Sequence, residues 1–450
     1  MASRLTVFCR NVSVGLAIAL AAPATAAAAP DPMLSQQWAL SDPAAIGAQE
    51  AWSQSSGDGV LVAVLDTGIQ VDHPDLAANV WTNPGEVPAN GRDDDANGIV
   101  DDVHGANMFD LSANVDDDNG HGTHVAGIIA ARRGNGIGGS GLAPGAKILP
   151  VKVLDSSMAG TTGSLSRGIR YAVDLGAKIL SVSVNSDGVT DEMRSAVRYA
   201  GERGAIIVAS AGNNGRNIDL VPSYPAALSD PAILSVAADT ASGNLWKLSN
   251  TGLLSVDLAA PGEHIVSAVS ASAYQSRTGT SAAAPFVSAS LALLAAARPD
   301  LPMSALRDAI LDTARRSNIL ASLLAGGRLD VGAAMHRVLD GLRWNMASPL
   351  TTTGVASDAI TVPSLRLRTR STARANARVR LHWSAAGADS VSRWRVSLDG
   401  RVVASVSARR TGFSRRIPRT GRHRWRVVGF DAQAAKVVSG QRAFRVVRRR

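Results

Sequence analysis

Short runs of apolar residues recur in the first half of the chain, at residues 60–65, 178–184 and 205–211. Val, Ile, Leu and Ala dominate each run, and charged residues are almost absent from them. Runs of this length are typical of parallel strands that are buried on both faces of a sheet. Helical patterns begin at His121 and after Ser281, and further ones lie near residues 304–314 and 331–342. Together these patterns predict an α/β domain with a mostly parallel sheet.

The pattern changes to alternation of apolar and polar residues after residue 365. Val379, Leu381 and Trp383 alternate with polar residues, and the same spacing recurs at residues 394–398, 425–427 and 444–446. Asp399-Gly400 is a strong signal for a hairpin turn. We therefore expect residues 365–450 to form a small antiparallel β-sandwich, after a linker at residues 345–364 that is rich in Ser, Thr and small residues. This pattern resembles fibronectin type III or immunoglobulin-like accessory modules.

The first 28 residues have the pattern of a secretory signal peptide. Arg4 and Arg10 form a basic region before an apolar stretch at residues 12–22, and residues 24–26 fit a small-residue cleavage site. A membrane anchor is the less favoured alternative, because the apolar stretch is short for a membrane span. We expect no later stretch to cross a bilayer, and we expect the protein to be secreted, either outside the cell or into a periplasm. Cys9 is the only cysteine and would leave with the signal, so the mature protein would have no disulfide.

Charge divides the chain into two parts. Residues 351–450 contain 23 Arg and Lys against 4 Asp and Glu, a net charge of +19, whereas the rest carries 23 basic and 33 acidic residues, a net charge of −10. The basic part either presents a solvated, charged face or is attracted to an acidic surface such as anionic lipid or polysaccharide. No nucleic-acid-binding motif accompanies the charge, so we expect no specific nucleic-acid binding.

Three separate segments carry the side chains of nucleophilic acyl transfer. They are residues 64–68 with Asp66, residues 119–127 with His121, and residues 279–285 with Ser281. A serine hydroxyl becomes an effective nucleophile when an imidazole takes its proton. A buried carboxylate must then hold the imidazole in one tautomer and stabilise its charged form. The order Asp, His, Ser along the chain is that of the subtilisin type of catalytic triad.

These segments resemble the three signature blocks of the subtilisin-like serine peptidases, and the similarity extends from about Asp31 to about Asp340. The resemblance implies a three-layer peptidase domain at residues 29–344, in which Asp66, His121 and Ser281 form the triad. Residues 208–214 resemble the segment that carries the oxyanion asparagine, which places Asn213 in that role, although an asparagine after a strand is also a common turn residue. The resemblance further implies the following substrate-binding residues: Ser183, Val184, Asn185, Ala209, Ser210, Ala211 and Gly212.

The chain departs from the family pattern at three positions. Asn185 replaces a glycine and would place a side chain at the rim of the first specificity pocket, while Ala282 and Phe286 replace the usual Met and His. There is also no room for the family's folding propeptide between the signal peptide and Asp31. These features leave open a catalytically impaired binding or surface protein. We favour a secreted endopeptidase acting on proteins or peptides, because all three blocks are intact; the sequence does not predict its oligomeric state.

Two segments have the residue types of calcium sites. In the first, Asp93, Asp95 and Asn97 alternate before Gly98, with Ile99 as a carbonyl donor and Asp102 to close the cage. The alternative is a solvated acidic turn. We expect a structural calcium ion here, although the chain has His104 in place of the last glutamate of an EF-hand.

The family resemblance implies a second calcium site at a glycine-rich turn. Asn135, Asp31 and Asp75 would supply side-chain oxygens, and Arg133, Ile137 and Gly139 would supply backbone carbonyls. An ordinary turn is the alternative. His124, three residues after His121, could suggest zinc, but no glutamate lies between them, so we expect a packed core histidine.

Overall fold

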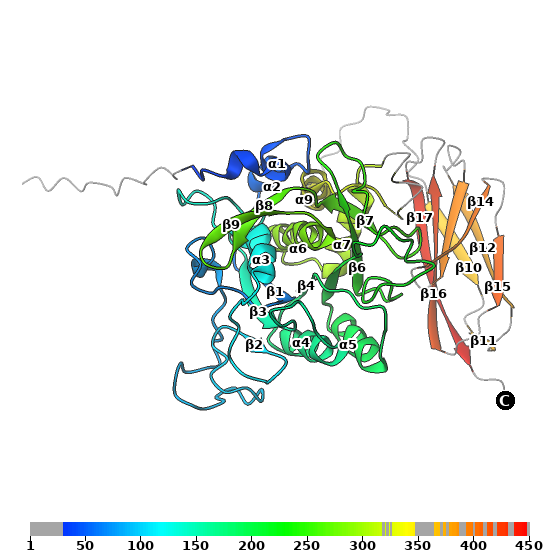
Figure 1. Ribbon diagram of the computed structural model, residues 1–450. Helices are drawn as coiled ribbons and strands as arrows, with labels where there is room; N and C mark the ends of the chain where they lie inside the picture. The colour runs from blue at the N-terminus through cyan, green and yellow to red at the C-terminus, as the bar shows by residue number, and fades with distance from the viewer. Residues whose placement is uncertain are drawn as a thin grey trace, which may run out of the picture.

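The computed structural model describes residues 30–316, 320, 324 and 326–346, and eight strands between residues 364 and 447 (Figure 1). The predicted signal peptide, nearly all of the predicted linker and the Asp399-Gly400 turn lie outside the described residues.

A seven-stranded sheet lies at the centre of the first part of the chain, in the order β2-β3-β1-β4-β5-β6-β7, and all of its neighbouring strands are parallel. The strands are β1 (Leu61–Asp66), β2 (Ala106–Asn107), β3 (Lys147–Lys152), β4 (Ile179–Val182), β5 (Ile206–Ser210), β6 (Ile233–Asp239) and β7 (Leu258–Pro261). The predicted strands β1, β4 and β5 are confirmed as buried parallel strands, and each ends before or at a predicted active-site segment.

Helices cover both faces of this sheet, which confirms the three-layer α/β architecture (Figure 1). On β1, Val62 and Val64 pack in the core with α3 and α6, whereas Ala63 and Leu65 pack on the other face with α4 and α5. The helices are α1 (Trp38–Ser41), α2 (Ala48–Trp52), α3 (His121–Ala130), α4 (Thr162–Asp174), α5 (Asp191–Glu202), α6 (Thr280–Ala297), α7 (Met303–Thr313) and α9 (Val331–Met346), with 3₁₀ turns η1 (Leu34–Gln36) and η2 (Ala77–Asn79).

A two-stranded antiparallel hairpin, β8 (Ile265–Val269) and β9 (Ala273–Arg277), leads into α6. We expected no stretch after the signal peptide to be long and apolar enough to cross a bilayer. This is wrong for α6, which has the length and hydropathy of a membrane span. The structure gives the reason for its apolar composition, since 78% of its residues are buried. Helix α6 contacts strands β4, β5, β6 and β7 and helices α3 and α7, and is the core helix of the domain.

Alternating residues after position 364 form two sheets, one of order β10-β12-β15 and one of order β11-β17-β16-β13-β14. The strands are β10 (Ser364–Thr369), β11 (Thr372–Arg374), β12 (Arg378–Ala386), β13 (Arg393–Leu398), β14 (Arg401–Ser407), β15 (Gly412–Arg416), β16 (Gly421–Phe430) and β17 (Lys436–Val447). Val379, Leu381 and Trp383 of β12 are buried, as are Val396 and Val427. The arginine side chains of these strands lie outside the described part of the structure.

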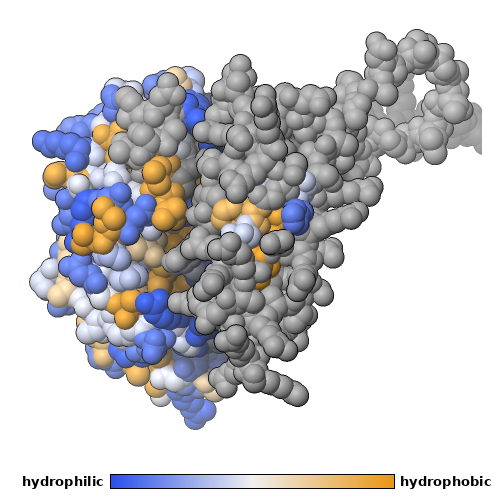
Figure 2. Space-filling model, turned by 90° about the vertical axis from the view of Figure 1, so that its right-hand side faces the viewer, coloured by the Kyte–Doolittle hydropathy of each residue, from blue (hydrophilic) through white to orange (hydrophobic). Residues whose placement is uncertain are grey.

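On the face of the molecule drawn in Figure 2, the described surface carries small apolar patches that are separated by hydrophilic residues. The most exposed large apolar side chain of the described residues is Leu220 at 79% exposure, followed by Leu254 at 59%. Scattered apolar residues of this kind are ordinary on a protein surface.

Candidate active site

Asp66 and His121 come together at the carboxyl end of the parallel sheet. Asp66 is the last residue of β1 and His121 is the first residue of α3. His121 Nδ1 lies 2.6 Å from Asp66 Oδ1, which also accepts a hydrogen bond of 2.8 Å from the backbone N–H of Thr67. Asp66 is fully buried and His121 is 7% exposed. This is the crevice in which open α/β sheets bind their ligands.

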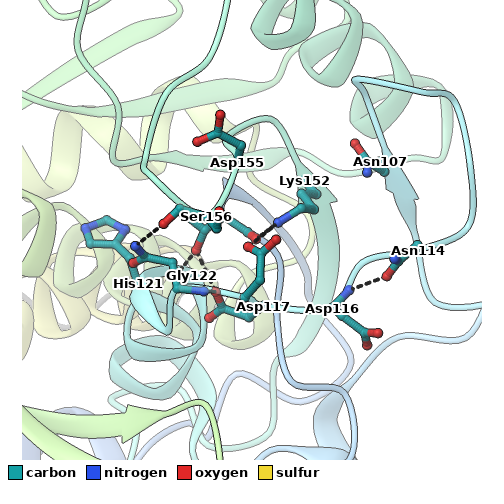
Figure 3. Close-up of polar contacts among 12 residues, drawn as sticks. Asn107, Asn114, Asp116, Asp117, His121, Gly122, Lys152, Asp155 and Ser156 are labelled. Atoms are coloured by element: carbon teal, nitrogen blue, oxygen red, sulfur yellow. Dashed lines mark hydrogen bonds and ion pairs between the residues drawn. The ribbon is translucent and has the colours of Figure 1, made fainter.

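Asp117 fixes the start of α3 and therefore the position of His121. Its carboxylate accepts hydrogen bonds from Gly120 N at 2.7 Å, Thr123 N at 2.8 Å and Thr67 Oγ1 at 2.8 Å. Thr67 Oγ1 in turn accepts a hydrogen bond of 2.9 Å from Gly122 N. Asp117 and Gly122 lie beside His121 in Figure 3. The sequence did not reveal this role of Asp117, because its Thr67 partner lies 50 residues away.

The pKa of His121 reflects opposing influences. Burial acts to lower it, but the charge of Asp66 and the hydrogen bond to Asp66 outweigh burial, so the pKa is raised above its ordinary value. The positive charge of Arg277 acts in the opposite direction to Asp66. An imidazole with such a pKa can accept a proton near neutral pH and return it later.

Ser281 lies in the first turn of α6, where it lines a cavity together with His121. Its Oγ donates to the Ser183 carbonyl at 3.4 Å, and Ser183 Oγ donates to the Ser281 carbonyl at 3.1 Å. Ser281 and His121 line the same cavity of about 190 Å³, although no hydrogen bond joins them within the described residues. Such contacts are often long or misaligned before substrate binds.

Asn213 lines both of the cavities that Ser281 lines. Asn213 Oδ1 accepts from Thr280 N at 2.8 Å and from Thr280 Oγ1 at 2.9 Å. Because the oxygen is held by Thr280, the Nδ2 group is left as a donor toward the cavities that Asn213 and Ser281 both line. No sequence pattern indicated the role of Thr280, and its position directly before Ser281 is the one available signal.

The predicted substrate-binding residues divide into two groups. Ser183, Val184 and Asn185 line a second cavity of about 260 Å³, which Ser281 and Asn213 also line. The exposed Asn185 donates from Nδ2 to the Ser210 carbonyl at 2.8 Å and accepts from Ser210 Oγ at 3.2 Å. Ala209, Ser210, Ala211 and Gly212 are buried and do not line this cavity. The Asn185 side chain thus joins the segment that follows β4 to the last residue of β5.

His124 packs in the core, as expected. It is 2% exposed, and its Nε2 lies 3.0 Å from the Ile265 carbonyl and 3.2 Å from that of Gln275. Burial lowers the pKa of His124 to about 3, so its imidazole is uncharged at neutral pH. Ala282 and Phe286, two departures from the family pattern, are also buried.

The acidic loop gathers three carboxylates, from Glu86, Asp95 and Asp102, with one oxygen atom of each within 4.8 Å of the others. The sequence analysis missed Glu86, which lies outside the alternating motif. Asp93 does not belong to this group: its oxygens accept from Asn97 N at 3.0 Å and Gly98 N at 2.8 Å.

Amides complete the surroundings of this acidic group. Asn97 Nδ2 donates to Asp95 at 3.1 Å and to Asp102 at 2.9 Å. Ile99 N donates to Asn97 Oδ1 at 2.9 Å, and the Ile99 side chain is buried. Burial raises the pKa of Asp102, and the charge of Asp95 adds to this effect. Glu86 Oε2 is buried without a hydrogen-bond partner among the described residues. A cation held by oxygen ligands fits this donor set.

The second predicted metal segment brings Asp31, Asp75 and Asn135 together. Asp31 accepts backbone hydrogen bonds from Gly134 at 2.8 Å and Asn135 at 3.0 Å, and Asn135 Nδ2 donates to Asp75 at 2.8 Å. Burial raises the pKa of Asp75 to about 6. The turn that carries Arg133, Ile137 and Gly139 therefore packs against both carboxylates.

Comparison with known proteins identifies relatives of this chain. Residues 57–333, more than half of the chain, match the model of the subtilase family. Thermitase of Thermoactinomyces vulgaris is 37% identical over 294 residues, which are 65% of this chain and 95% of thermitase. A cell wall-associated protease of Bacillus subtilis (strain 168) is 39% identical over 254 residues, or 56% of this chain and 25% of that protein.

A solved structure with a similar fold is described as proteases from Pseudoalteromonas arctica PAMC 21717. It matches with a TM-score of 0.58 and 26% identity, over 69% of this chain and 99% of that chain.

Proposed function

The chain belongs to the subtilase family of serine peptidases, and from this premise we propose that it is a secreted endopeptidase that cleaves proteins and peptides through an acyl-enzyme intermediate. The single observation that carries the proposal is the 2.6 Å contact between His121 and Asp66 beside the cavity that His121 shares with Ser281 and Asn213.

The reaction begins when the Ser281 side chain turns from the Ser183 carbonyl toward His121. Oγ attacks the substrate carbonyl carbon while His121 Nε2 takes the hydroxyl proton, and Asp66 stabilises the imidazolium. Asn213 Nδ2 and the Ser281 backbone N–H donate to the oxyanion. The C–N bond then breaks as His121 gives its proton to the leaving amine.

Deacylation repeats these steps with water as the nucleophile. His121 takes a proton from the water, the hydroxide oxygen attacks the acyl carbon, and the proton returns to Ser281 Oγ as the ester bond breaks. The carboxylic acid product leaves and the free enzyme is restored. Ala282 and Phe286 are buried and supply no reacting atom, so these departures do not favour the impaired-protein alternative.

The experiment that tests this function is hydrolysis of a denatured protein mixture by the wild type and by Ser281→Ala, with cleavage sites read by mass spectrometry. We expect cleavage by the wild type at many internal sites and none by the variant. A folded wild type, judged by circular dichroism, that cleaves nothing would favour the binding-protein alternative. Equal cleavage by both proteins would show that Ser281 is not the nucleophile.

We also propose that the group formed by Glu86, Asp95 and Asp102 holds a structural calcium ion. The Ile99 carbonyl would be a further ligand, as would the Asn97 side-chain oxygen once its amide turns so that the oxygen replaces Nδ2 beside Asp95 and Asp102. Three carboxylates within 4.8 Å repel one another unless a cation lies between them. Calcium would supply that charge and brace the loop. The pair Asp31 and Asp75 is a second candidate, with Asn135 and the carbonyls of Arg133, Ile137 and Gly139.

For the remainder of the chain we propose an accessory role. The alternating strands after residue 364 support a β-sandwich of the fibronectin type III or immunoglobulin kind. The net charge of +19 on residues 351–450 supports attraction to an acidic surface. The N-terminal pattern of residues 1–28 supports secretion. The mass and N-terminal sequence of the protein recovered from culture medium would test both the removal of the signal peptide and the retention of the basic part.

A further inference from the structure

Arg277 places a positive charge in the active-site cavity. It is the last residue of β9, four positions before Ser281, and it lines the cavity of about 190 Å³ together with His121, Asn213 and Ser281. The charge is close enough to His121 to act on the pKa of that imidazole. The catalytic steps derived above do not use this guanidinium.

The guanidinium is available to a ligand. Arg277 donates one hydrogen bond, from Nε to Gln275 Oε1 at 3.0 Å, and it has no ion pair among the residues that the structure describes. The carboxylates whose charges act on the pKa of Arg277 are engaged elsewhere, Asp66 with His121 and Asp117 with the start of α3. Arg277 is partly buried, and burial lowers its pKa, but an arginine remains charged at every physiological pH. Partial burial also strengthens its attraction for an anion.

Ser281 lines both cavities, and their other lining residues indicate which part of a substrate Arg277 would contact. The larger cavity is lined by Ser183, Val184 and Asn185, the segment assigned to the acyl part of the substrate, but not by His121 or Arg277. The smaller cavity is lined by His121 and Arg277, but not by residues 183–185. Because His121 must protonate the leaving amine, the smaller cavity lies on the leaving-group side of the scissile bond.

We propose that Arg277 is a specificity-determining residue that selects peptides with an acidic side chain immediately after the scissile bond. This inference rests on the proposed peptidase function and deepens it. A glutamate or aspartate in the leaving group would meet the guanidinium and form a charge-assisted hydrogen bond. A lysine or arginine there would be repelled by a like charge.

The test uses three peptides that differ only in the residue after the scissile bond, which is Glu, Gln or Lys. For the wild type we expect kcat/KM to be about 5- to 10-fold higher for Glu than for Gln, and lower still for Lys. In Arg277→Gln the ratio of Glu to Gln should fall to about one, and in Arg277→Glu the order should reverse so that Lys is preferred. These are ratios within one protein, so a general loss of activity does not affect them.

The control variant is Arg203→Gln, which removes an equal charge from the end of α5, where Arg203 lies over the Tyr199 ring. It should keep the wild-type preference. Raised ionic strength should weaken the preference of the wild type, because the cavity is open to solvent.

Two results would overturn the inference: equal kcat/KM for the three peptides in the wild type, or the same preference in Arg277→Gln as in the wild type. Failure of the proposed function would look different. In that case no peptide would be cut and a serine-directed phosphonate would leave Ser281 unlabelled, whereas an enzyme that labels and cuts without charge preference refutes only the role of Arg277.

Discussion

At the scale of single residues, the active site depends on side chains that orient other side chains. Thr280 holds the oxygen of Asn213, so the amide nitrogen faces the cavity. Asp66 holds Nδ1 of His121, so Nε2 is left to exchange protons with Ser281. Each of these hydrogen bonds holds a reacting group in its productive orientation before the substrate binds. Groups that are oriented in advance lower the activation free energy, because they need not reorganise during the reaction.

Asn213→Ala should lower kcat by about 10²- to 10³-fold with a much smaller effect on KM, because the amide meets the oxyanion in the transition state and not the ground-state carbonyl. Steady-state kinetics on one peptide would measure this. Asn214→Ala is the matched control, because Asn214 is exposed and lines neither cavity. A similar loss in both variants would mean that the Asn213 side chain is not the oxyanion donor.

The pH dependence of kcat/KM should follow His121, which must be neutral to accept the Ser281 proton. Its pKa is raised by Asp66, so activity should fall as the pH drops through a value above 6.5. Arg277 acts to lower the pKa of His121, so Arg277→Gln should raise that pKa and move the acidic limb to higher pH. The charged groups around His121 are Asp66, Asp117 and Arg277. An acidic limb that moves to lower pH in this variant would contradict this electrostatic account.

Asn185→Gly should broaden the choice of residue before the scissile bond. The bonds from Asn185 join the segment after β4 to Ser210 at the end of β5, so a large substrate side chain must displace them. The wild type should prefer small residues, and the variant should gain about 10-fold in kcat/KM for a phenylalanine peptide relative to an alanine peptide. Asn244→Gly, at an exposed turn, serves as the control. An unchanged ratio in Asn185→Gly would mean that this side chain does not limit the pocket.

The sequence predicted the reacting residues because each lies in a contiguous motif. It did not reveal Thr280, Asp117 or Arg277, whose importance comes from partners far away in the chain. Thr280 and Asn213 are 67 residues apart, and nothing in either segment marks the contact. Glu86 was missed for a related reason, since it joins Asp95 and Asp102 from outside the acidic motif.

At the scale of secondary-structure elements, the site is a junction of strand ends and helix starts. Strands β1, β4 and β5 end at Asp66, Val182 and Ser210, while α3 and α6 begin at His121 and Thr280. The carboxyl ends of parallel strands meet at one edge, and helix N-termini favour the negative charge that develops on the oxyanion.

Gly122→Ala should disturb the junction of α3 with β1. A methyl group there would lie 2.0 Å from the Gly68 carbonyl oxygen and 3.1 Å from Asp66 Cβ, so the helix must move. We expect a loss of about 1–3 kcal/mol in unfolding free energy, measured by urea denaturation, and a fall in kcat as His121 shifts. Gly188→Ala is the control, because nothing lies within 4 Å of its added methyl group. Wild-type stability and kcat in Gly122→Ala would contradict the close approach.

Continuous apolar runs predicted β1, β4 and β5, and helical patterns predicted α6, α7 and α9 to within a few residues. The predicted runs 178–184 and 205–211 extend past the observed carboxyl ends of β4 and β5, whereas β1 ends one residue after its predicted run. Residues 183–185 and 211–213 leave the sheet to form the site, and Gly212 takes a positive φ of 103°. An apolar run cannot mark that departure, because Ser183, Ala211 and Gly212 stay buried after the strands have ended. Strand β2, with two residues, is too short to produce a pattern.

At the scale of the whole molecule, an acidic catalytic part precedes a basic one. The acidic part has no cysteine after residue 9, so no disulfide can stabilise it and its stability rests on packing. Composition predicted this division of charge directly. Composition could not predict which strands after residue 364 pair with one another, because the register of a strand pair depends on contacts between residues far apart in the chain.

A calcium chelator should lower the melting temperature measured by calorimetry, since a ligand that binds only the folded state stabilises it. Asp95→Asn removes one carboxylate of the acidic group, and the effect of the chelator should be smaller in this variant. Asp110→Asn, outside that group, should respond like the wild type. If the chelator has no effect and Asp95→Asn raises the melting temperature, the three carboxylates merely repel one another and hold no cation.

The most direct test of the central claim is labelling of the folded protein with a serine-directed phosphonate, followed by intact-mass analysis and peptide mapping. The account predicts one adduct per molecule, located on Ser281, and at least 10³-fold slower labelling of Asp66→Asn, in which His121 loses its orienting carboxylate. No adduct on the folded wild type, an adduct on another residue, or equal labelling rates in Asp66→Asn would contradict the assignment of Asp66, His121 and Ser281 as a working triad.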